Sequence, residues 1–377
     1  MSKININQPT KEKPLRKPRI LVAPLDWGLG HATRCIPIIR ELMTQGADVW
    51  LAGERTQKDL LQQEFPDLPL LTLEGYRIKY ASSGIGLLFS IFRQTGKIIS
   101  TIKKENEWLK KMVAEHGFDA VISDNRYGLY HPDIPSIFIT HQLTIKSPLD
   151  KWTEKILQKR NYLYINQFRE CWVPDAEDDN NLAGALSHPE NKPLVPVYYI
   201  GSLSRFKINN EPVKHNHLLF ILSGPEPQRS ILENKIIQQI AHYPSTATIV
   251  RGLPGFESII PSTSLIKFYN HLPADELKKE IEQASYVISR SGYSTIMDLI
   301  KMKKKSILIP TPGQTEQEYL ASYLSKKQFA FCVSQKEFSL TGSLKDAEQF
   351  SYQFPQVNSG QLLPQAITKL LSSLHQH

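Results

Sequence analysis

The alternation of short apolar runs with helical patterns limits the fold of this chain more than any other feature. Residues 20–25, for example, are apolar and are followed by a glycine turn and then by a helical pattern over residues 34–44. Runs of this kind bounded by Gly or Pro are typical of strands, and strands separated by helices form parallel sheets with both faces covered. The sequence therefore predicts an α/β fold built from doubly wound, Rossmann-like sheets.

The length and the punctuation of the chain predict two domains. At 377 residues it exceeds the size of one ordinary core, and its strand–helix pattern restarts after a Pro- and Asn-rich stretch typical of a linker. Ligands of doubly wound sheets bind at the carboxyl ends of the strands, so two facing domains predict a cleft between them. The expected parts are a flexible basic tail at 1–18, a first domain at 19–200, a linker at 201–217, a second domain at 218–350, and a segment at 351–377 whose amphipathic helix could pack back on the first domain.

Composition limits the partners and the compartment. The net charge of +8 favours an anionic partner, such as a nucleotide or an acidic lipid surface. Cys35, Cys171 and Cys332 are few and widely spaced, which predicts a reduced, cytoplasmic protein without a zinc cluster. The first 18 residues lack the apolar core of a signal peptide, and no apolar run is long enough for a membrane span.

The first glycine turn is the earliest candidate for chemistry. Gly28 and Gly30 would let a ligand approach the backbone closely, but Thr33 stands where a dinucleotide fingerprint has Gly or Ala. The positive end of the following helix would lower the pKa of His31 and leave it able to accept a proton. A structural role at the helix start stays open for His31.

Polar groups also lie at the ends of three other predicted strands, two in the first half of the chain and one in the second half. Asp124 could act as a general base, orient His31 or cap the next segment, and His141 has the same ambiguity. At the end of the strand predicted at 218–223, three residues could meet a phosphate at the next helix, although an ordinary loop explains them equally well. These three are Ser223, Gly224 and Arg229.

The segment 286–324 has the strongest functional pattern. One strand ends at Arg290, Ser291 and Gly292, and Ser294 and Thr295 then open a helix, where backbone amides and hydroxyls suit a diphosphate. Asp298, one turn into that helix, could accept hydrogen bonds from ribose hydroxyls. After the next strand, a helix start presents amides and carboxylates suited to sugar hydroxyls. These are Gln314, Glu316, Gln317 and Glu318.

This segment resembles the donor-binding signature of family 28 glycosyltransferases, a family that includes N-acetylglucosaminyl- and diacylglycerol glycosyltransferases. Arg290, Gly292 and Thr295 fall on the family pattern, Gln317 matches a sugar-contacting glutamine, and Asp298 stands where the family has Glu. The first turn, ending in a histidine, is similar to the glycine loop of the family. The resemblance brackets residues 19–330 and implies the GT-B architecture, in which two Rossmann-like domains face an interdomain cleft.

The resemblance also implies an activity. We expect an inverting transfer of a sugar from a UDP-sugar, such as UDP-N-acetylglucosamine, to a hydroxyl of a glycan or lipid-linked acceptor. His31, or less favourably Asp124, would take the proton from that hydroxyl. The family needs no metal cofactor, and the absence of an Asp-x-Asp motif agrees with this. We expect no nucleic-acid partner.

Other interpretations remain open at this point. Between Ile85 and Lys104 an apolar ridge edged with cations is expected either to touch an anionic membrane peripherally, at its cytoplasmic face, or to form a buried helix with a solvated basic face. A nucleotide-sugar epimerase of the same architecture, a nicotinamide-dependent oxidoreductase, or an inactive nucleotide-sugar-binding module are the alternative functions.

Overall fold

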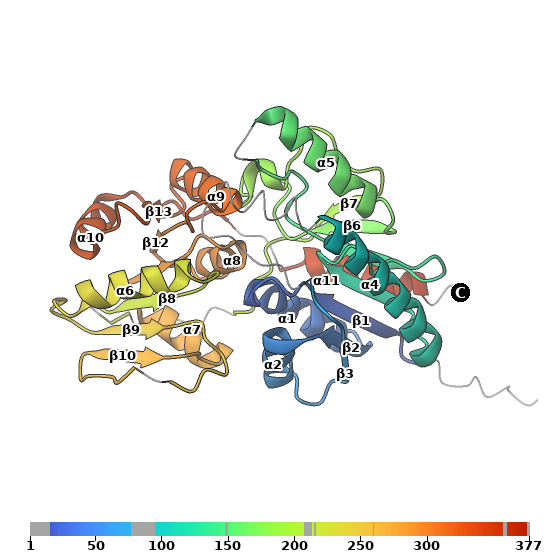
Figure 1. The fold of residues 1–377 in the computed structure, drawn as a ribbon, viewed down its shortest axis with the longest axis horizontal. Helices are drawn as coiled ribbons and strands as arrows, with labels where there is room; N and C mark the ends of the chain where they lie inside the picture. The colour runs from blue at the N-terminus through green and yellow to red at the C-terminus, as the bar shows by residue number, and fades with distance from the viewer. Residues whose placement is uncertain are drawn as a thin grey trace, which may run out of the picture.

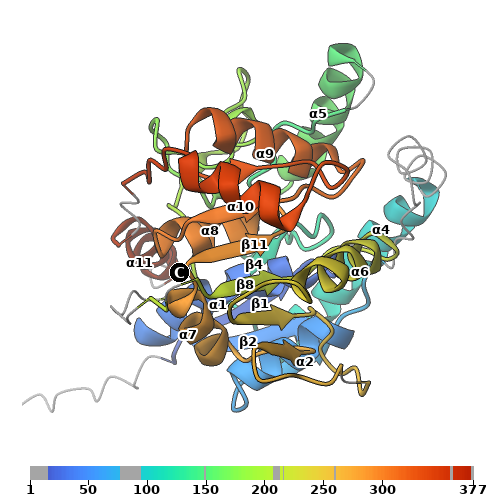
Figure 2. The ribbon, with the colours of Figure 1, turned by 90° about the vertical axis from the view of Figure 1, so that its left-hand side faces the viewer.

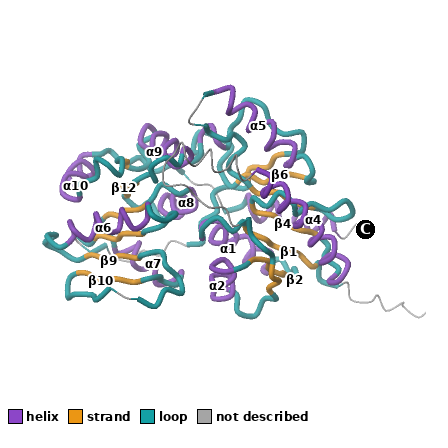
Figure 3. The backbone as a smooth tube through the Cα atoms, viewed as in Figure 1, coloured by secondary structure: helices purple, strands orange, loops and turns teal. Residues whose placement is uncertain are grey.

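Two parallel sheets lie side by side in the computed structural model, each covered by helices (Figure 1). The structure describes residues 16–76, 95–147, 150–206, 213–214, 216–258, 260–356 and 360–374. Every strand pair within the two sheets is parallel, and helices cover both faces of each sheet, which Figure 3 shows by secondary structure. The prediction of an α/β fold with two doubly wound sheets is confirmed.

The first sheet has the strand order β3-β2-β1-β4-β5-β6-β7. Its strands are β1 (Arg19–Pro24), β2 (Asp48–Gly53), β3 (Leu70–Thr72), β4 (Ala120–Asp124), β5 (Ser136–Ile139), β6 (Glu170–Val173) and β7 (Val197–Tyr199). Its helices are α1 (Leu29–Thr44), α2 (Arg55–Glu64), α4 (Thr95–His116) and α5 (Lys151–Ile165), with a short 3₁₀ turn at Gly184–Leu186.

Strand β1 shows why this sheet is buried on both faces. Ile20 and Val22 point into the core cluster that contains α1, whereas Leu21 and Ala23 point into the cluster that contains Leu109 of α4. All four side chains are fully buried, as expected for the centre of a parallel sheet. The chain order reverses between β1 and β4, and this switch point lies at the ends of both strands, where ligands of such sheets bind.

The second sheet has the order β10-β9-β8-β11-β12-β13. Its strands are β8 (Leu218–Ile221), β9 (Ala247–Val250), β10 (Ile266–Tyr269), β11 (Tyr286–Ser289), β12 (Ser306–Leu308) and β13 (Phe331–Cys332). Its helices are α6 (Gln228–Ile240), α7 (Ala274–Gln283), α8 (Tyr293–Lys301), α9 (Thr315–Lys326) and α10 (Leu340–Gln349). The switch point here lies between β8 and β11.

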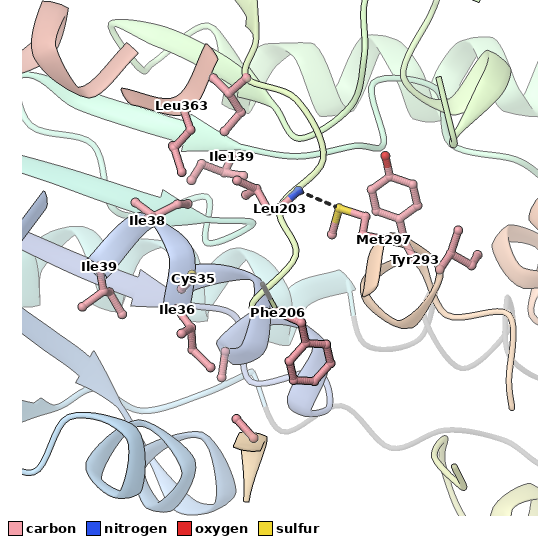
Figure 4. Close-up of a cluster of buried hydrophobic side chains, with 14 of the residues drawn as sticks. Cys35, Ile36, Ile38, Ile39, Ile139, Leu203, Phe206, Tyr293, Met297 and Leu363 are labelled. Carbon is pink, nitrogen blue, oxygen red and sulfur yellow. Dashed lines mark hydrogen bonds between the residues drawn. The ribbon is translucent and has the colours of Figure 1, made fainter. Parts of the chain in front are cut away.

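Apolar contacts join the two sheets' helices through the chain that connects them. One continuous core cluster contains Ile36 of α1, Leu203 and Phe206 of the connection, and Met297 of α8 (Figure 4). The backbone N–H of Leu203 donates to Sδ of Met297 at 3.2 Å. The start of α1 therefore lies against the start of α8.

The last helix, α11 (Leu362–Leu374), lies on the first domain although it follows the second domain in sequence (Figure 1). Ile367 and Leu370 are buried in the core cluster shared with α1. The Gln45 side-chain amide donates to the Pro364 carbonyl at 3.0 Å, and Nζ of Lys369 donates to the Tyr198 hydroxyl at 2.8 Å. The chain thus crosses between the domains twice.

Helix α1 begins five residues earlier than the pattern at 34–44 indicates. Gly28 precedes its first turn with φ of +74°, a conformation that favours glycine. The early start places His31 and Arg34, three residues apart, on one face of the helix. None of the helices in the described ranges has the length and apolar character needed to span a bilayer.

Candidate active site

Four side chains of the first domain meet at the carboxyl ends of its central strands. His31 and Arg34 come from the first turns of α1, Asp124 is the last residue of β4, and His141 follows β5. Arg34, Asp124 and His141 are at most 3% exposed. The switch point between β1 and β4 therefore holds a buried polar cluster in place of apolar packing.

The Arg34 guanidinium lies at the centre of this cluster. Its Nε donates to Oδ2 of Asp124 at 2.7 Å, and its Nη2 donates to Oδ1 of the same carboxylate. Nη2 also lies 2.8 Å from Nδ1 of His31, and Nη1 lies 3.0 Å from Nδ1 of His141. One guanidinium thus positions a carboxylate and two imidazoles, which its planar fork of five donors makes geometrically feasible.

The charges of His31 and Asp124 at neutral pH follow from this arrangement. Burial lowers the pKa of His31, Arg34 lowers it further, and Asp124 acts in the opposite direction. Burial alone would raise the pKa of Asp124, but Arg34 and His31 outweigh it and hold that pKa far below its ordinary value. His31 is therefore neutral and Asp124 is an anion whose oxygens are already bonded. Asp124 is poorly suited to accept a proton and well placed to orient His31.

The neutral His31 ring can carry its proton on either nitrogen. With the proton on Nδ1, it donates to Oδ1 of Asp124, 3.3 Å away, and Nε2 keeps a free lone pair. With the proton on Nε2, Nδ1 accepts from Arg34. Nε2 forms no hydrogen bond with any residue that the structure describes. Only the first tautomer can act as a base at Nε2.

The second domain reaches this cluster through the starts of α8 and α9. Glu316 accepts from Nε2 of His141 at 2.8 Å, and the His141 ring stacks on Tyr293 with centroids 4.1 Å apart. Oγ of Ser294 donates to the carbonyl of Gly30 at 2.8 Å, and a Cβ at Gly30 would lie only 3.0 Å from that Oγ. The absence of a side chain at Gly30 thus lets the two helix starts approach each other.

Arg290 is a buried cation without a carboxylate partner in the described part of the chain. Its side chain is 1% exposed, and it donates to the carbonyls of Gln228, Ile309 and Pro310. Among the described residues, neither its Nε nor the buried hydroxyl of Thr311 has a hydrogen-bond partner. Burial lowers the pKa of Arg290 to about 10, so the guanidinium is still charged at neutral pH. An uncompensated buried charge favours an anionic ligand nearby.

The glycine loop after β8 borders the same corner. Gly224 is exposed with φ of +103°, and a Cβ there would lie 3.5 Å from the Thr311 hydroxyl. Ser223 is also exposed, while Gly292 and Thr295 are half-buried at the start of α8. The structure thus brings the loop after β8 to the ends of β11 and β12, as the predicted donor site requires.

The predicted sugar-contacting residues mostly shape their own loop. Oε1 of Gln317 accepts from the Thr311 N–H at 2.9 Å, and its amide donates to Gln314 at 2.6 Å. Glu318 accepts from the Gly313 N–H at 2.8 Å, and the Ser291 hydroxyl donates to the carbonyl of Gln317 at 2.9 Å. A contact of these side chains with a sugar stays a prediction.

A phosphate contact at Arg229 stays a prediction, and it would require the present partners of Arg229 to give way. Its side chain is buried and points to two carboxylates, Glu226 at 2.6 Å and Glu233 at 3.1 Å. Glu233 also binds Arg251 at 2.6 Å. These glutamates neutralise Arg229 inside its own domain, a pairing that the sequence spacing of i and i+4 would have allowed us to expect.

Asp298 faces the interdomain connection. Its Oδ1 accepts from the Ser204 hydroxyl at 2.7 Å and from the Arg205 N–H at 3.2 Å, and its Oδ2 lies 3.3 Å from Nε of Arg205. Burial raises the pKa of Asp298, and Arg205 offsets part of that shift. A ribose contact at Asp298 stays a prediction and requires Ser204 or Arg205 to give way.

Arg34 and Tyr293 were not predicted as site residues from the sequence, and the role of His141 stayed open. The available signal for Arg34 was its spacing of three residues from His31, which puts both on one helix face. Tyr293 gave no polar signal, because its role here is to stack on His141.

We predict that Arg229→Met lowers the free energy of unfolding by about 1–3 kcal/mol, because it removes charge-assisted hydrogen bonds from a buried cluster. Nucleotide affinity should stay unchanged. Denaturant unfolding and calorimetric titration with UDP measure the two quantities. A loss of UDP affinity at unchanged stability would instead show that Arg229 contacts the nucleotide.

Comparisons with known proteins agree with this geometry. Residues 262–361 match the family model described as Glycosyltransferase family 28 C-terminal domain. An uncharacterized glycosyltransferase of Methanosarcina mazei is 20% identical over 347 residues, which cover 84% of this chain and 86% of that protein.

A second relative comes from Glaesserella parasuis and is named UDP-N-acetylglucosamine--N-acetylmuramyl-(pentapeptide) pyrophosphoryl-undecaprenol N-acetylglucosamine transferase. It is 22% identical over 340 residues, covering 85% of this chain and 86% of the relative. Among solved structures, the glycotransferase of kitacinnamycin superposes with a TM-score of 0.60 at 14% identity over 96% of both chains. The family match and the relatives indicate the activity, and the solved structure indicates the fold. The chain is a glycosyltransferase with the GT-B fold, and its residues 262–361 are similar to the C-terminal domain of family 28.

Proposed function

We propose that the chain transfers a sugar, with inversion, from a UDP-sugar such as UDP-N-acetylglucosamine to a hydroxyl of a glycan or lipid-linked acceptor. The observation that carries this proposal is the meeting of two helix N-termini. The Ser294 hydroxyl bonds the Gly30 carbonyl, so the positive ends of α1 and α8 converge from the two domains. This is a favourable place for a diphosphate.

The leaving diphosphate would be stabilised by fixed positive groups. Arg290 offers a buried charge without a carboxylate partner among the described residues, and the N-terminus of α8 offers backbone amides. Gly224 and Gly292 leave room for the backbone to approach the ligand. We therefore propose that no metal cofactor is needed, which an assay in excess EDTA checks.

The hydrogen bonds of the two carboxylates at the site are consistent with direct displacement at the anomeric carbon. Asp124 is held by Arg34, and Glu316 accepts from His141, so neither is set up to attack the anomeric carbon as a nucleophile. A single base that activates the acceptor hydroxyl is sufficient for inversion. We assign that role to His31 in the tautomer with the proton on Nδ1 and oriented by Asp124.

The UDP-N-acetylglucosamine donor and the lipid-linked acceptor are supported by the name of the Glaesserella relative. At 22% identity the sugar and the acceptor can differ, so both belong to the proposal.

The acceptor side of the enzyme has a surface suited to an anionic membrane. Helix α5 projects from the first domain (Figure 2), and Trp152, Ile156 and Leu163 are 70%, 42% and 68% exposed along one of its faces. Four exposed cations lie beside them, and none forms an ion pair within the described part of the chain. These cations are Lys151, Lys155, Lys159 and Arg160.

An exposed apolar stripe edged with cations is typical of a helix that lies at an anionic bilayer surface. We propose peripheral binding through α5, on the cytoplasmic face, where the unpaired Cys35, Cys171 and Cys332 would stay reduced. Residues 85–94 of the ridge between Ile85 and Lys104 lie outside the described residues. Its described end, with the exposed Lys103 and Lys104, belongs to α4.

We predict that His31→Ala lowers turnover by about two orders of magnitude or more, the scale of general-base loss, while UDP affinity survives. Turnover is measured after a calorimetric screen of UDP, UDP-sugars and NAD has named the donor. Near-normal turnover would remove His31 from catalysis. Binding of NAD without UDP would contradict the donor, and epimerised donor without acceptor would favour an epimerase.

We predict that Lys155→Glu/Lys159→Glu weakens binding to vesicles containing anionic phosphatidylglycerol by about tenfold or more, because each cation near such a surface contributes about 1 kcal/mol. Cosedimentation measures this, with zwitterionic vesicles as reference. Leu265→Ser, an exposed apolar site of the second domain, is the control. Equal binding of wild type to both vesicle types would exclude α5 as an anionic-membrane contact.

A further inference from the structure

Arg34 bonds both histidines of the site in a way that fixes where their protons lie. A guanidinium has only donors, so an imidazole nitrogen within hydrogen-bond distance of it must accept. Nδ1 of His31 and Nδ1 of His141 lie 2.8 Å and 3.0 Å from its two terminal nitrogens. The other neighbour of Nδ1 of His31, Oδ1 of Asp124, lies farther away at 3.3 Å, so the contacts with Arg34 favour the proton on Nε2 in both neutral rings.

The contact with the second domain agrees with this assignment. Nε2 of His141 faces Oε1 of Glu316 at 2.8 Å, and a carboxylate accepts, so the proton of His141 lies on Nε2. The stacking of Tyr293 on the His141 ring fixes its plane. Donors and acceptors thus alternate from Arg34 through His141 to Glu316.

The same assignment has a consequence for His31. With the proton on Nε2, the ring can donate to an oxygen in the cleft but has no lone pair there for the proton of an acceptor hydroxyl. The proton must move to Nδ1 for His31 to act as a base, and Arg34 must first release Nδ1 to Asp124, whose Oδ1 is 3.3 Å away.

We infer that Arg34 is a positioning residue that locks His31 in its non-basic tautomer, and that the bond between His141 and Glu316 ties this lock to the second domain. The inference rests on the proposed base role of His31. Arg34 is held on one side by Asp124 and on the other by His141. Glu316 is one of the residues predicted to contact the donor sugar. Its displacement would release His141 and so free Nη1 of Arg34.

The test is the protonation of the His31 nitrogens, read by ¹H–¹⁵N NMR of the imidazole in the substrate-free, full-length chain. Wild type should carry the proton on Nε2. Arg34→Met and Arg34→Lys should move it to Nδ1, toward Asp124. The lysine variant keeps a cation beside Asp124 and serves if the methionine variant does not fold, because its single nitrogen cannot replace the fork that reaches both imidazoles.

The matched control is Arg40→Met on the same helix, which pairs with Glu64 at the surface and should leave His31 unchanged. A wild-type His31 with the proton on Nδ1, or an Arg34→Lys variant that keeps it on Nε2, would overturn the lock. Glu316→Ala should raise the fraction of His31 with the proton on Nδ1, and an unchanged fraction would overturn the coupling to the second domain.

This measurement needs no substrate, so it separates the lock from the proposed function. If the proton of His31 moves to Nδ1 in the Arg34 variants but wild type shows no transferase activity, the tautomer lock is supported and the proposed function is contradicted. If wild type is an active transferase but the proton does not move in the Arg34 variants, the proposed function stands and Arg34 has no locking role.

Discussion

The buried ion pair between Arg34 and Asp124 fixes the first domain's half of the site. Moving both charges out of water costs several kcal/mol per ion, so such a pair is weak evidence for stability. Its contribution here is geometric, because the planar guanidinium holds Asp124 and, through its remaining donors, His31 and His141. The early start of α1 makes this possible by bringing Arg34 over the end of β4.

The second domain brings positive groups to this cluster, and at the corner where we propose that a diphosphate binds, Arg290 has no carboxylate partner among the described residues. Ser294 joins the starts of α1 and α8, and Gly30 is small enough to allow it. Arg290 adds a buried cation, while Glu316 is bonded to His141. In the proposed function, this arrangement separates the base that takes the proton of the acceptor from the groups that stabilise the leaving diphosphate.

The sheets and most helices could be predicted from the sequence, because strand and helix periodicities are local. The strand ends that carry Asp124 and Arg290 were also predictable, since parallel strands present their carboxyl ends at one edge. Partners that come from distant segments were not: Asp298 is covered by the linker residue Arg205, and Glu233, four residues from Arg229 on the same helix, also binds the distant Arg251. A residue's chemical type indicates what it can bind, whereas packing decides what it does bind.

The most direct test of the account is an experimental structure of the chain with UDP. The account predicts the diphosphate at the start of α8, between Gly224 and Ser294 and near Arg290, with His31 facing the cleft beside it. A nucleotide bound elsewhere, with the start of α8 closed against the first domain and Arg290 remote from any phosphate, would contradict the central claim that two helix N-termini and a buried guanidinium form the donor site.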